Sequence, residues 1–308
     1  MEALNAALPS SLTRKIDCKQ GAVRAIRFNV DGNYCLSCGA DKTVKLWNPY
    51  TGVMLKTYTG TGWEVLDAQG SCDNSLILAG GFDKQLTVFD VESGKITRRW
   101  RGHNGRINSV AFNEESTVAI SGSQDGTVRC FDMRDKSGPI QTLDEATDAI
   151  LSVDVSAHEI ASGSADSNVR VYNIRDGRMT VDYLGESVTS VHFSGDGQCV
   201  LASTKDGFVR LMDKLNGKLL ADYTGHKNKD YRIESCLLST DAHVVSGSED
   251  GNVFVWSLIE MSTLLQLQHP HPVVHSVSAH PKTSALMSAA GCSIFLWEAP
   301  PQQESEDQ

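Results

Sequence analysis

The histidines offer the first candidate for chemistry, because four of the nine in the chain lie between residues 269 and 280. Imidazole is a common zinc ligand, so His269, His271, His275 and His280 could form a metal site. However, His275 and His280 lie near opposite ends of one expected strand, and five strand residues span roughly 16 Å, too far for one ion. His269 and His271 each precede a proline, which favours a stiff loop. We therefore predict no metal here.

The cysteines are the second candidate, since Cys35 and Cys38 form a C-x-x-C pair. This pair lies inside an expected strand, where residues three apart point to opposite faces of the sheet. That geometry suits neither zinc nor a redox pair. All eight cysteines are scattered, mostly in apolar strand contexts, as small buried side chains would be in a reducing compartment.

Motifs for catalysis and for phosphate binding are the third candidate. Glycine-rich pieces at 39–42 and 194–197 lie between expected strands, and neither begins a helix, so their context does not fit phosphate binding. No G-x-S-x-G motif is followed by a helical pattern. We predict no catalytic residues and no cofactor.

The elements that position these residues follow from a repeat. An Asp is followed six residues later by an aromatic or large apolar residue, and the steps between successive large residues are 42, 42, 41, 40, 44 and 41. The pairs are Asp41/Trp47, Asp83/Phe89, Asp125/Phe131, Asp166/Tyr172, Asp206/Met212 and Asp250/Trp256, and the seventh, Gly291/Trp297, has lost the Asp. A period near forty with this content predicts a propeller of four-stranded blades.

One repeat, residues 102–143, shows the expected blade. Strands are predicted at 106–112, 118–123, 127–132 and 139–143, and Asp125-Gly126 is a strong hairpin signal. Blades are expected at about 21–59, 62–101, 104–144, 147–184, 186–224, 227–267 and 272–297. The last blade lacks a fourth strand, which residues 12–17 would supply. This predicts an all-β, seven-bladed propeller over 12–297, closed by its N-terminal strand, with flexible ends at 1–11 and 298–308.

Composition narrows the class of protein further. The formal net charge is −10 and the isoelectric point is about 5.3, which disfavours nonspecific or sequence-specific nucleic-acid binding as the main activity. No apolar stretch reaches the roughly 18 residues of a membrane span. We expect a soluble, monomeric, intracellular propeller with no membrane partner.

The repeats resemble the WD40 repeat family over residues 12–297. In that family a His, a Ser or Thr, the turn Asp and a Trp form a structural hydrogen-bonded set. The resemblance carries the complete set to blade 6 as His226, Ser246, Asp250 and Trp256. Blade 3 has His103, Ser121 and Asp125, but Phe131 lacks an indole N–H, and blade 1 has Ser37, Asp41 and Trp47 without the His.

Longer segments resemble one branch of the family more closely. They are GAVRAIRFNVDGNYCLSCGADKTVKLWNP at 21–49, YTGHKNKDYRIE at 223–234 and HVVSGSEDGNVFVW at 243–256. That branch contains scaffold proteins of mitogen-activated protein kinase cascades that are also associated with the spliceosome. The resemblance implies kinase-cascade components and splicing factors as partners, and a location in cytoplasm and nucleus.

Binding is expected on the face where the loops between blades and the turns between second and third strands surround the channel mouth. Candidate partner-binding residues there are Trp63, Phe82, Arg24, Arg106, Lys227, Lys229, Tyr231 and Arg232. Aromatic residues and arginines are favoured interface anchors, and the loop after His226 is three residues longer than its blade 3 counterpart. The alternatives are a Trp63 that caps the channel rim, a solvated charged loop after His226, and a role for Arg24 and Arg106 in holding neighbouring blades together.

The prediction for function is a non-enzymatic scaffold that assembles signalling proteins of a mitogen-activated protein kinase cascade. The alternative is a protein subunit of the spliceosome, acting in pre-mRNA splicing, and the two roles could coexist. A third hypothesis, an enzyme that uses the channel mouth, has no supporting motif.

Overall fold

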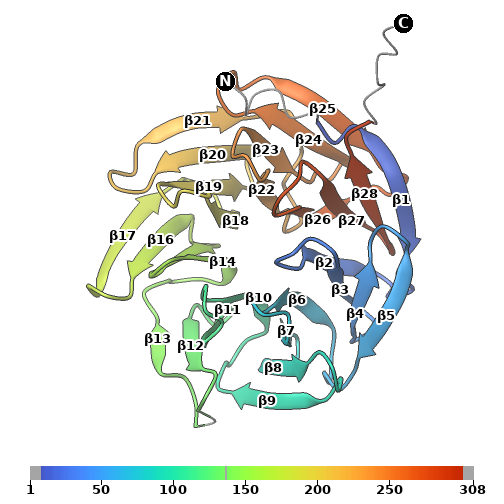
Figure 1. Cartoon of the computed structure of the whole chain (residues 1–308). Helices are drawn as coiled ribbons and strands as arrows, with labels where there is room; N and C mark the ends of the chain where they lie inside the picture. Colours follow the sequence, from blue (N-terminus) through green and yellow to red (C-terminus); the bar gives the residue numbers. More distant parts are fainter. Residues whose placement is uncertain (1–7, 136, 301–308) are drawn as a thin grey trace, which may run out of the picture.

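The chain forms a ring of small sheets around a central channel (Figure 1). A computed structural model describes residues 8–135 and 137–300, so parts of the predicted flexible ends, 1–7 and 301–308, lie outside the described residues. The described residues form 28 strands in seven four-stranded antiparallel sheets, and no helix. The predicted all-β, seven-bladed propeller is therefore confirmed.

Each blade takes four strands, counted from the channel outward. Blades 1 to 3 contain β2 (Val23–Phe28), β3 (Cys35–Gly39), β4 (Val44–Asn48), β5 (Val53–Tyr58); β6 (Val65–Gly70), β7 (Leu76–Gly81), β8 (Gln85–Asp90), β9 (Ile96–Arg101); β10 (Ile107–Phe112), β11 (Val118–Ser123), β12 (Val128–Asp132), β13 (Gln141–Leu143). Blades 4 and 5 contain β14 (Ile150–Ser156), β15 (Glu159–Ser164), β16 (Asn168–Asn173), β17 (Arg178–Tyr183); β18 (Val188–Phe193), β19 (Cys199–Thr204), β20 (Phe208–Asp213), β21 (Leu219–Tyr223). Blades 6 and 7 contain β22 (Ser235–Leu237), β23 (His243–Ser246), β24 (Asn252–Ser257), β25 (Thr263–Gln268); β26 (Val274–Ala279), β27 (Leu286–Ala290), β28 (Ser293–Glu298), β1 (Ser11–Asp17).

The last blade is completed by the beginning of the chain. β1 pairs antiparallel with β28, from Ser11 opposite Glu298 to Asp17 opposite Ser293. This confirms the predicted closure by residues 12–17. The pairing also includes Ser11 and Glu298, one residue beyond each end of the expected propeller. Closure removes an open edge at β28, which would otherwise present unpaired backbone groups.

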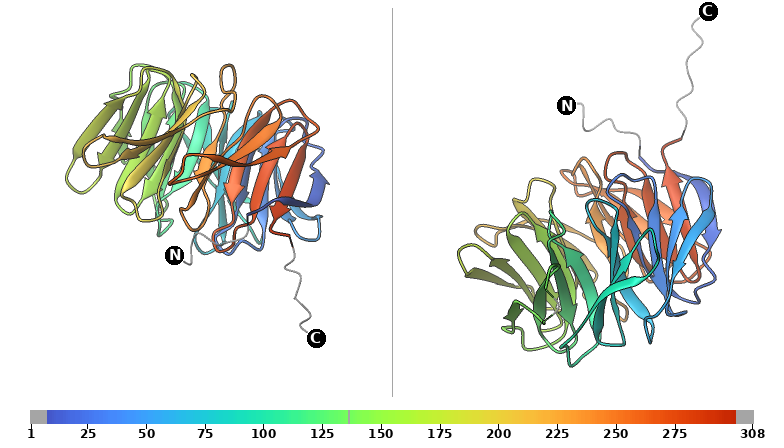
Figure 2. Two further views of the ribbon diagram at one scale, coloured as in Figure 1. Left: turned by 90° about the horizontal axis from the view of Figure 1, so that it is seen from above. Right: turned by 60° about the horizontal axis from the view of Figure 1, so that its bottom comes forward.

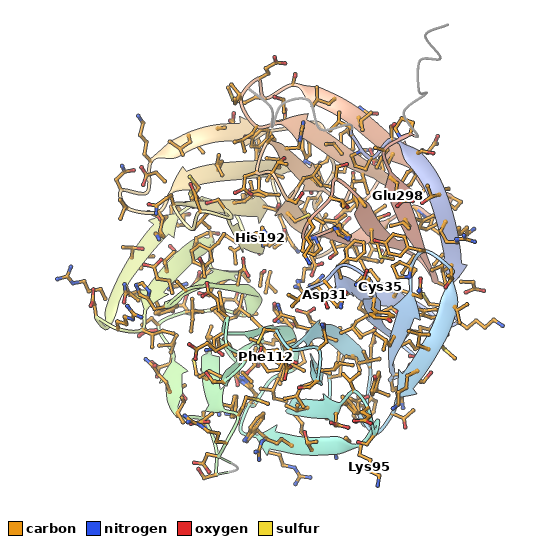
Figure 3. All side chains as sticks on the ribbon, in the orientation of Figure 1. Asp31, Cys35, Lys95, Phe112, His192 and Glu298 are labelled. Carbon is orange, nitrogen blue, oxygen red and sulfur yellow. The ribbon has the colours of Figure 1, made fainter. Side chains whose placement is uncertain are left out.

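The core lies between the blades, because each short sheet buries both faces against its neighbours. In β3, Cys35 packs in a cluster with Ile294 and Leu296 of blade 7, whereas Cys38 packs in a cluster with Val65 of blade 2. The two cysteines thus point to opposite faces, as strand alternation requires. Side chains fill the spaces between successive blades all around the ring (Figure 3).

The inner strands are tied together through their side chains. The N–H of Ile26 in β2 donates to Ser276 Oγ of β26 at 3.1 Å, and the N–H of Val153 in β14 donates to Ser109 Oγ of β10 at 3.2 Å. An inner strand has no ladder partner on its channel side, so these hydroxyls satisfy backbone groups that would otherwise lack a partner. This arrangement makes the channel wall a continuous, rigid support.

Strands of each blade run between two faces of the disk (Figure 2). One face carries the turns between second and third strands beside the loops that enter each blade, since the N–H of Phe82 donates to Glu64 O and that of Gln124 to Arg106 O. We call this the mouth face. β28 runs away from Gly291 on the mouth face and ends at Glu298, which pairs with Ser11. Glu298 and Ser11 therefore lie on the other face of the disk.

Candidate functional site

The channel mouth is built from a bulge that recurs at the start of the inner strands. The pairing of first and second strands shifts register in six of the blades, at Val23/Ala25, Val65/Asp67, Ile107/Ser109, Ile150/Ser152, Val188/Ser190 and Val274/Ser276. A bulge leaves one residue unpaired and redirects its side chain. The residues inside these shifts are Arg24, Leu66, Asn108, Leu151, Thr189 and His275.

Five of the bulge residues line one pocket at the mouth, of about 190 Å³. Its walls are Arg24, Leu66, Phe82, Arg106, Asn108, Leu151, Tyr231, Arg232 and His275. The structure thus brings together five of the eight candidates named from the sequence. Leu66, Asn108, Leu151 and His275 were missed. The signal that could have found them is the repeated pattern of an apolar residue, a variable residue and then a small or polar residue at each inner-strand start.

Arg106 and Phe82 form one side of the pocket. The guanidinium carbon of Arg106 lies 5.1 Å from the centre of the Phe82 ring, a cation–π contact, and its Nε donates to Asn108 Oδ1 at 3.1 Å. Phe82 is 38% exposed. Stacking on the ring and the Asn108 bond together orient the guanidinium while leaving its terminal nitrogens available.

Arg24 also lines the pocket, and its guanidinium already forms an ion pair with Glu64. Its Nε donates to Glu64 Oε1 at 2.5 Å, and both side chains are partly exposed. Its charge acts on the neighbouring His275, because burial first and Arg24 second lower the pKa of His275 to about 4. His275 is therefore a neutral wall of the pocket at physiological pH.

Tyr231 faces His275 from the loop that precedes blade 6, with ring centres 5.3 Å apart in an edge-to-face arrangement. The loop is held by Glu249, whose Oε1 accepts the N–H groups of Lys229, Asp230 and Tyr231 at 2.8, 2.7 and 2.8 Å. These bonds outweigh burial and lower the pKa of Glu249. The exposed Tyr231 ring is consequently carried on an ordered backbone.

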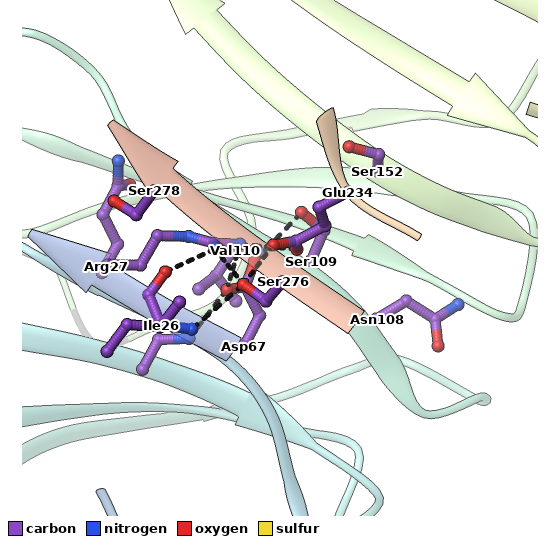
Figure 4. A network of polar contacts seen from close by, with 12 residues as sticks. Ile26, Arg27, Asp67, Asn108, Ser109, Val110, Ser152, Glu234, Ser276 and Ser278 are labelled. Carbon is purple, nitrogen blue, oxygen red and sulfur yellow. Dashed lines mark hydrogen bonds and ion pairs between the residues drawn. The ribbon is translucent and has the colours of Figure 1, made fainter. Parts of the chain in front are cut away.

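Below the pocket the channel is crossed by a network of charged side chains (Figure 4). Arg27 donates through Nη2 to Asp67 Oδ1 at 2.9 Å and to Glu234 Oε1 at 2.7 Å, which joins blades 1, 2 and 6. Ser276 of blade 7 also donates to Glu234. Burial alone would raise the pKa of Glu234, but the charge and hydrogen bonds of Arg27 lower it to about 2.

Arg232 belongs to both the pocket and this network. Its Nη1 donates to the backbone oxygen of Asn108 at 2.5 Å and its Nη2 to Glu234 Oε1 at 3.0 Å. Arg232 is therefore a fixed floor of the pocket and links blades 3 and 6. From the sequence, a role in holding blades together was considered for Arg24 and Arg106, whereas the alternative for the loop of Arg232 was a solvated charged loop. Arg27 and Glu234, at the heart of the network, were not named from the sequence.

Three predicted candidates lie outside the walls of the pocket. Trp63 is 63% exposed on the loop before β6, with the Lys42 ammonium 5.3 Å from its ring centre. Lys227 and Lys229 are exposed in the loop before blade 6, and their backbone N–H groups bond to Ser248 Oγ and Glu249. All three lie on loops of the mouth face, outside the pocket.

The hydrogen-bonded set predicted in blade 6 does not form. The two ring nitrogens of His226 are buried without a hydrogen-bond partner among the described residues, Ser246 donates to Gly247 O, and the Trp256 indole donates to Thr224 O. Asp250 accepts from the N–H of Asn252. His226 instead lies edge-on to Trp256, with ring centres 5.5 Å apart.

The long loop after His226 is anchored in another blade. Its buried Asn228 donates to Thr189 Oγ1 of blade 5 at 2.9 Å, which anchors the loop in the neighbouring blade.

Sets of this kind do form in three other blades. In blade 3, His103 lies 3.0 Å from Asp125 Oδ2 and 2.8 Å from Ser121 Oγ. In blade 7 the Trp297 indole and His269 both contact Ser288 Oγ, at 2.9 and 2.7 Å, without an Asp.

In blade 1 a glutamine replaces the histidine. Trp47 donates to Ser37 Oγ at 2.8 Å, Ser37 donates to Gln20 Oε1 at 2.5 Å, and Gln20 Nε2 donates to Asp41 at 3.3 Å. Gln20 was not predicted from the sequence, because the family pattern has a histidine at that position.

The remaining histidines have separate surroundings. His269 is bonded to Ser288, and the His280 ring accepts the N–H groups of Lys282 and Thr283 and lies edge-on to Phe28 at 5.1 Å. Within residues 8–135 and 137–300, no three His, Cys, Asp or Glu side chains are grouped to hold a metal ion. A bilayer-spanning helix is likewise not found among those residues.

Comparison with known proteins agrees with this architecture. The family model for the WD domain, G-beta repeat, matches residues 10–48, and the model for the nucleolar protein 10-like N-terminal domain matches residues 67–241. WD repeat domain-containing protein 83 of Rattus norvegicus is 54% identical over 94% of this chain and 92% of its own length. The Homo sapiens protein of the same name is 52% identical over the same shares, and the Dictyostelium discoideum homolog is 32% identical over 92% of this chain and 98% of its own. The chain belongs to the WD40 repeat family, in the group of WD repeat domain-containing protein 83.

Proposed function

We propose that this propeller is a non-enzymatic scaffold whose mouth face binds partner proteins. The observation that carries the proposal is the pocket at the mouth, where Arg106 lies over the Phe82 ring and Tyr231 forms another wall. Arginine and exposed aromatic residues are the side chains most often found as interface anchors. Here these side chains are carried by a closed ring, and hydrogen bonds hold Arg106 and the backbone of Tyr231 in place. Binding of a partner therefore costs little conformational entropy at these residues.

The partners that we propose are components of a mitogen-activated protein kinase cascade. Support comes from the resemblance of residues 21–49, 223–234 and 243–256 to scaffold proteins of those cascades. The second of these segments contains Tyr231 and Arg232, so the resemblance includes part of the pocket.

The alternative is a role as a protein subunit of the spliceosome, supported by the same resemblance. A propeller with two faces and a rim could serve both roles, in the cytoplasm and in the nucleus. Co-sedimentation with splicing complexes that survives ribonuclease treatment would support the alternative. A chain restricted to the cytoplasm would contradict it.

Affinity purification from separate nuclear and cytoplasmic extracts tests the scaffold proposal. The double variant Phe82→Ala/Arg106→Ala should lose at least one partner that the unaltered chain retains, with a thermal midpoint changed by only a few degrees. The matched control is Ile174→Ala/Arg175→Ala, an exposed pair on the opposite face, which should retain that partner. The proposal fails if the two double variants retain identical proteins.

A further inference from the structure

We infer that the mouth pocket recognises a short acidic segment of a partner protein, with one Asp or Glu carboxylate on Arg106 and a neighbouring apolar side chain against Leu66, Leu151 and Phe82. This inference rests on the proposed function and adds the chemistry of the partner. It follows from the charges, the walls and the position of the pocket.

The first step is the charge of the pocket. Arg24 is paired with Glu64 and Arg232 with Glu234, and His275 is neutral because burial and Arg24 lower its pKa to about 4. Arg106 makes one side-chain hydrogen bond, from Nε to the neutral Asn108. No carboxylate of the described residues forms an ion pair with Arg106, so the pocket carries one uncompensated positive charge.

The second step is the geometry of that charge. The guanidinium carbon of Arg106 lies over the Phe82 ring, 5.1 Å from its centre, and the terminal nitrogens of Arg106 form no hydrogen bond with the described residues. A planar guanidinium binds a carboxylate through two parallel hydrogen bonds at its edge. The contact with Phe82 and the bond to Asn108 hold Arg106 ready for such a bond.

The third step is the size and polarity of the walls. Leu66 and Leu151 are half-buried, and Phe82 and Tyr231 are 38% and 46% exposed, so the walls around Arg106 are partly apolar. A volume of about 190 Å³ admits one or two side chains of a segment and excludes a folded domain. An acidic residue with an apolar neighbour therefore fits both parts of the pocket.

The fourth step is the choice of occupant. A phosphate group carries close to two negative charges, whereas Arg106 alone among the arginines that line the pocket lacks an ion-pair partner, so a single carboxylate matches the charge of the pocket better. Nucleic acid is disfavoured by the net charge of −10. β28 runs away from the mouth and ends at Glu298 on the other face, so the chain continues from there and not from the pocket. A segment of a separate protein is the occupant that remains.

The test measures binding of fluorescein-labelled peptides to the full chain by fluorescence anisotropy. The probe is a library of eight-residue peptides that contain one Leu or Phe and one Asp or Glu, separated by zero to two Gly or Ser residues. The tightest acidic peptide should lose at least tenfold in affinity when its Asp or Glu becomes Asn or Gln. Arg106→Met should cause a similar loss, whereas the control Arg175→Met, on the opposite face, should stay within twofold.

Several results would overturn the inference. They are equal binding of the amide peptide, unchanged binding by a folded Arg106→Met variant, and phosphoserine peptides that bind at least tenfold more tightly than Asp peptides. If removal of residues 301–308 raises the affinity tenfold, the chain's own tail occupies the pocket and the assignment to a partner is wrong. Should Arg106→Met fail to fold, the exchange of Asp for Asn in the peptide tests the same contact on the unaltered chain. If no acidic peptide binds while affinity purification still retains partners through Phe82 and Arg106, the inference fails and the scaffold proposal stands.

Discussion

Arg232, in the loop before blade 6, donates a hydrogen bond across the channel to the backbone oxygen of Asn108 in blade 3, with Nη1 and O 2.5 Å apart. The same guanidinium donates to Glu234, which is itself bonded to Arg27 of blade 1. Blades that are not neighbours in the ring are thus joined through one cluster of charges. Arg232 belongs to this cluster and also lines the mouth pocket, so it contributes both to the stability of the ring and to the shape of the pocket.

Loss of Arg27 should destabilise the ring strongly. Arg27→Met leaves the buried carboxylates of Asp67 and Glu234 without their main partner, and breaking a buried ion pair costs about 3–5 kcal/mol. Chemical denaturation followed by tryptophan fluorescence measures the effect. The control is Arg24→Met, which breaks the more exposed pair with Glu64 and should cost below about 1 kcal/mol. Equal losses in the two variants would show that the channel network contributes no special stability.

The same network predicts an acid-sensitive stability. The pKa of Glu234 falls from 4.5 to about 2 on folding, because the charge of Arg27 outweighs burial. A carboxyl group whose pKa is lowered by folding stabilises the folded state at pH values above the pKa that it has in the unfolded chain. That contribution is lost as the pH falls from about 4.5 toward about 2. Thermal midpoints measured over this window should fall more steeply for the unaltered chain than for Glu234→Gln, and parallel curves would contradict the assignment.

Two buried histidines should respond in opposite ways to the same substitution. His103→Leu leaves Asp125 and Ser121 without their partner and should cost about 2–3 kcal/mol. His226 has no hydrogen-bond partner among the described residues, so His226→Leu should be neutral within about 1 kcal/mol or stabilising. Unfolding free energies from urea titrations compare the two variants directly. A larger loss for His226→Leu would mean that the hydrogen-bonded set of blade 6 forms after all.

Removal of β1 should open the ring. A chain that begins at residue 18 exposes the backbone of β28 and uncovers the apolar side chains of blade 7 that pack against Ile16. We therefore expect a lower thermal midpoint and self-association through the free edge. Size-exclusion chromatography with light scattering measures the association. A chain that begins at residue 8, with β1 intact, is the control and should remain monomeric. A monomeric, equally stable chain from residue 18 would contradict the role of β1 as the closing strand.

Replacement of Gln20 should weaken blade 1. Gln20 is buried and bonds to Ser37, Asp41 and the backbone oxygen of Thr43. Gln20→Ala should therefore cost about 1–3 kcal/mol, because it leaves buried polar groups without partners. Gln20→His, which restores the residue typical of this position, should recover part of the loss in the same denaturation measurement. No recovery would show that the glutamine bonds are specific to this blade.

The sequence alone determined the number of blades and their closure. The interval of 40 to 44 residues between successive pairs, from Asp41/Trp47 onward, reflects a local unit of short strands and tight turns. Such units can bury both faces only by stacking in a ring. The missing strand of the last blade and the matching strand at 12–17 are also local patterns. For the mouth, the sequence indicated five of the residues that line the pocket, because loop positions follow from strand order. They are Arg24, Phe82, Arg106, Tyr231 and Arg232.

Only the tertiary structure decided which of these residues meet and what they bond to. Arg27 and Glu234 are 207 positions apart, and no local pattern pairs them across a channel. In the loop that follows His226, Asn228 bonds to Thr189 of blade 5, a contact that no local pattern predicts. The motif of blade 6 is complete in the sequence, yet the ring nitrogens of His226 have no hydrogen-bond partner among the described residues. Glutamine takes over the same task in blade 1. Strand alternation and turn chemistry act over a few residues, whereas hydrogen-bond partners depend on atoms brought within about 3 Å by the closing of the whole ring.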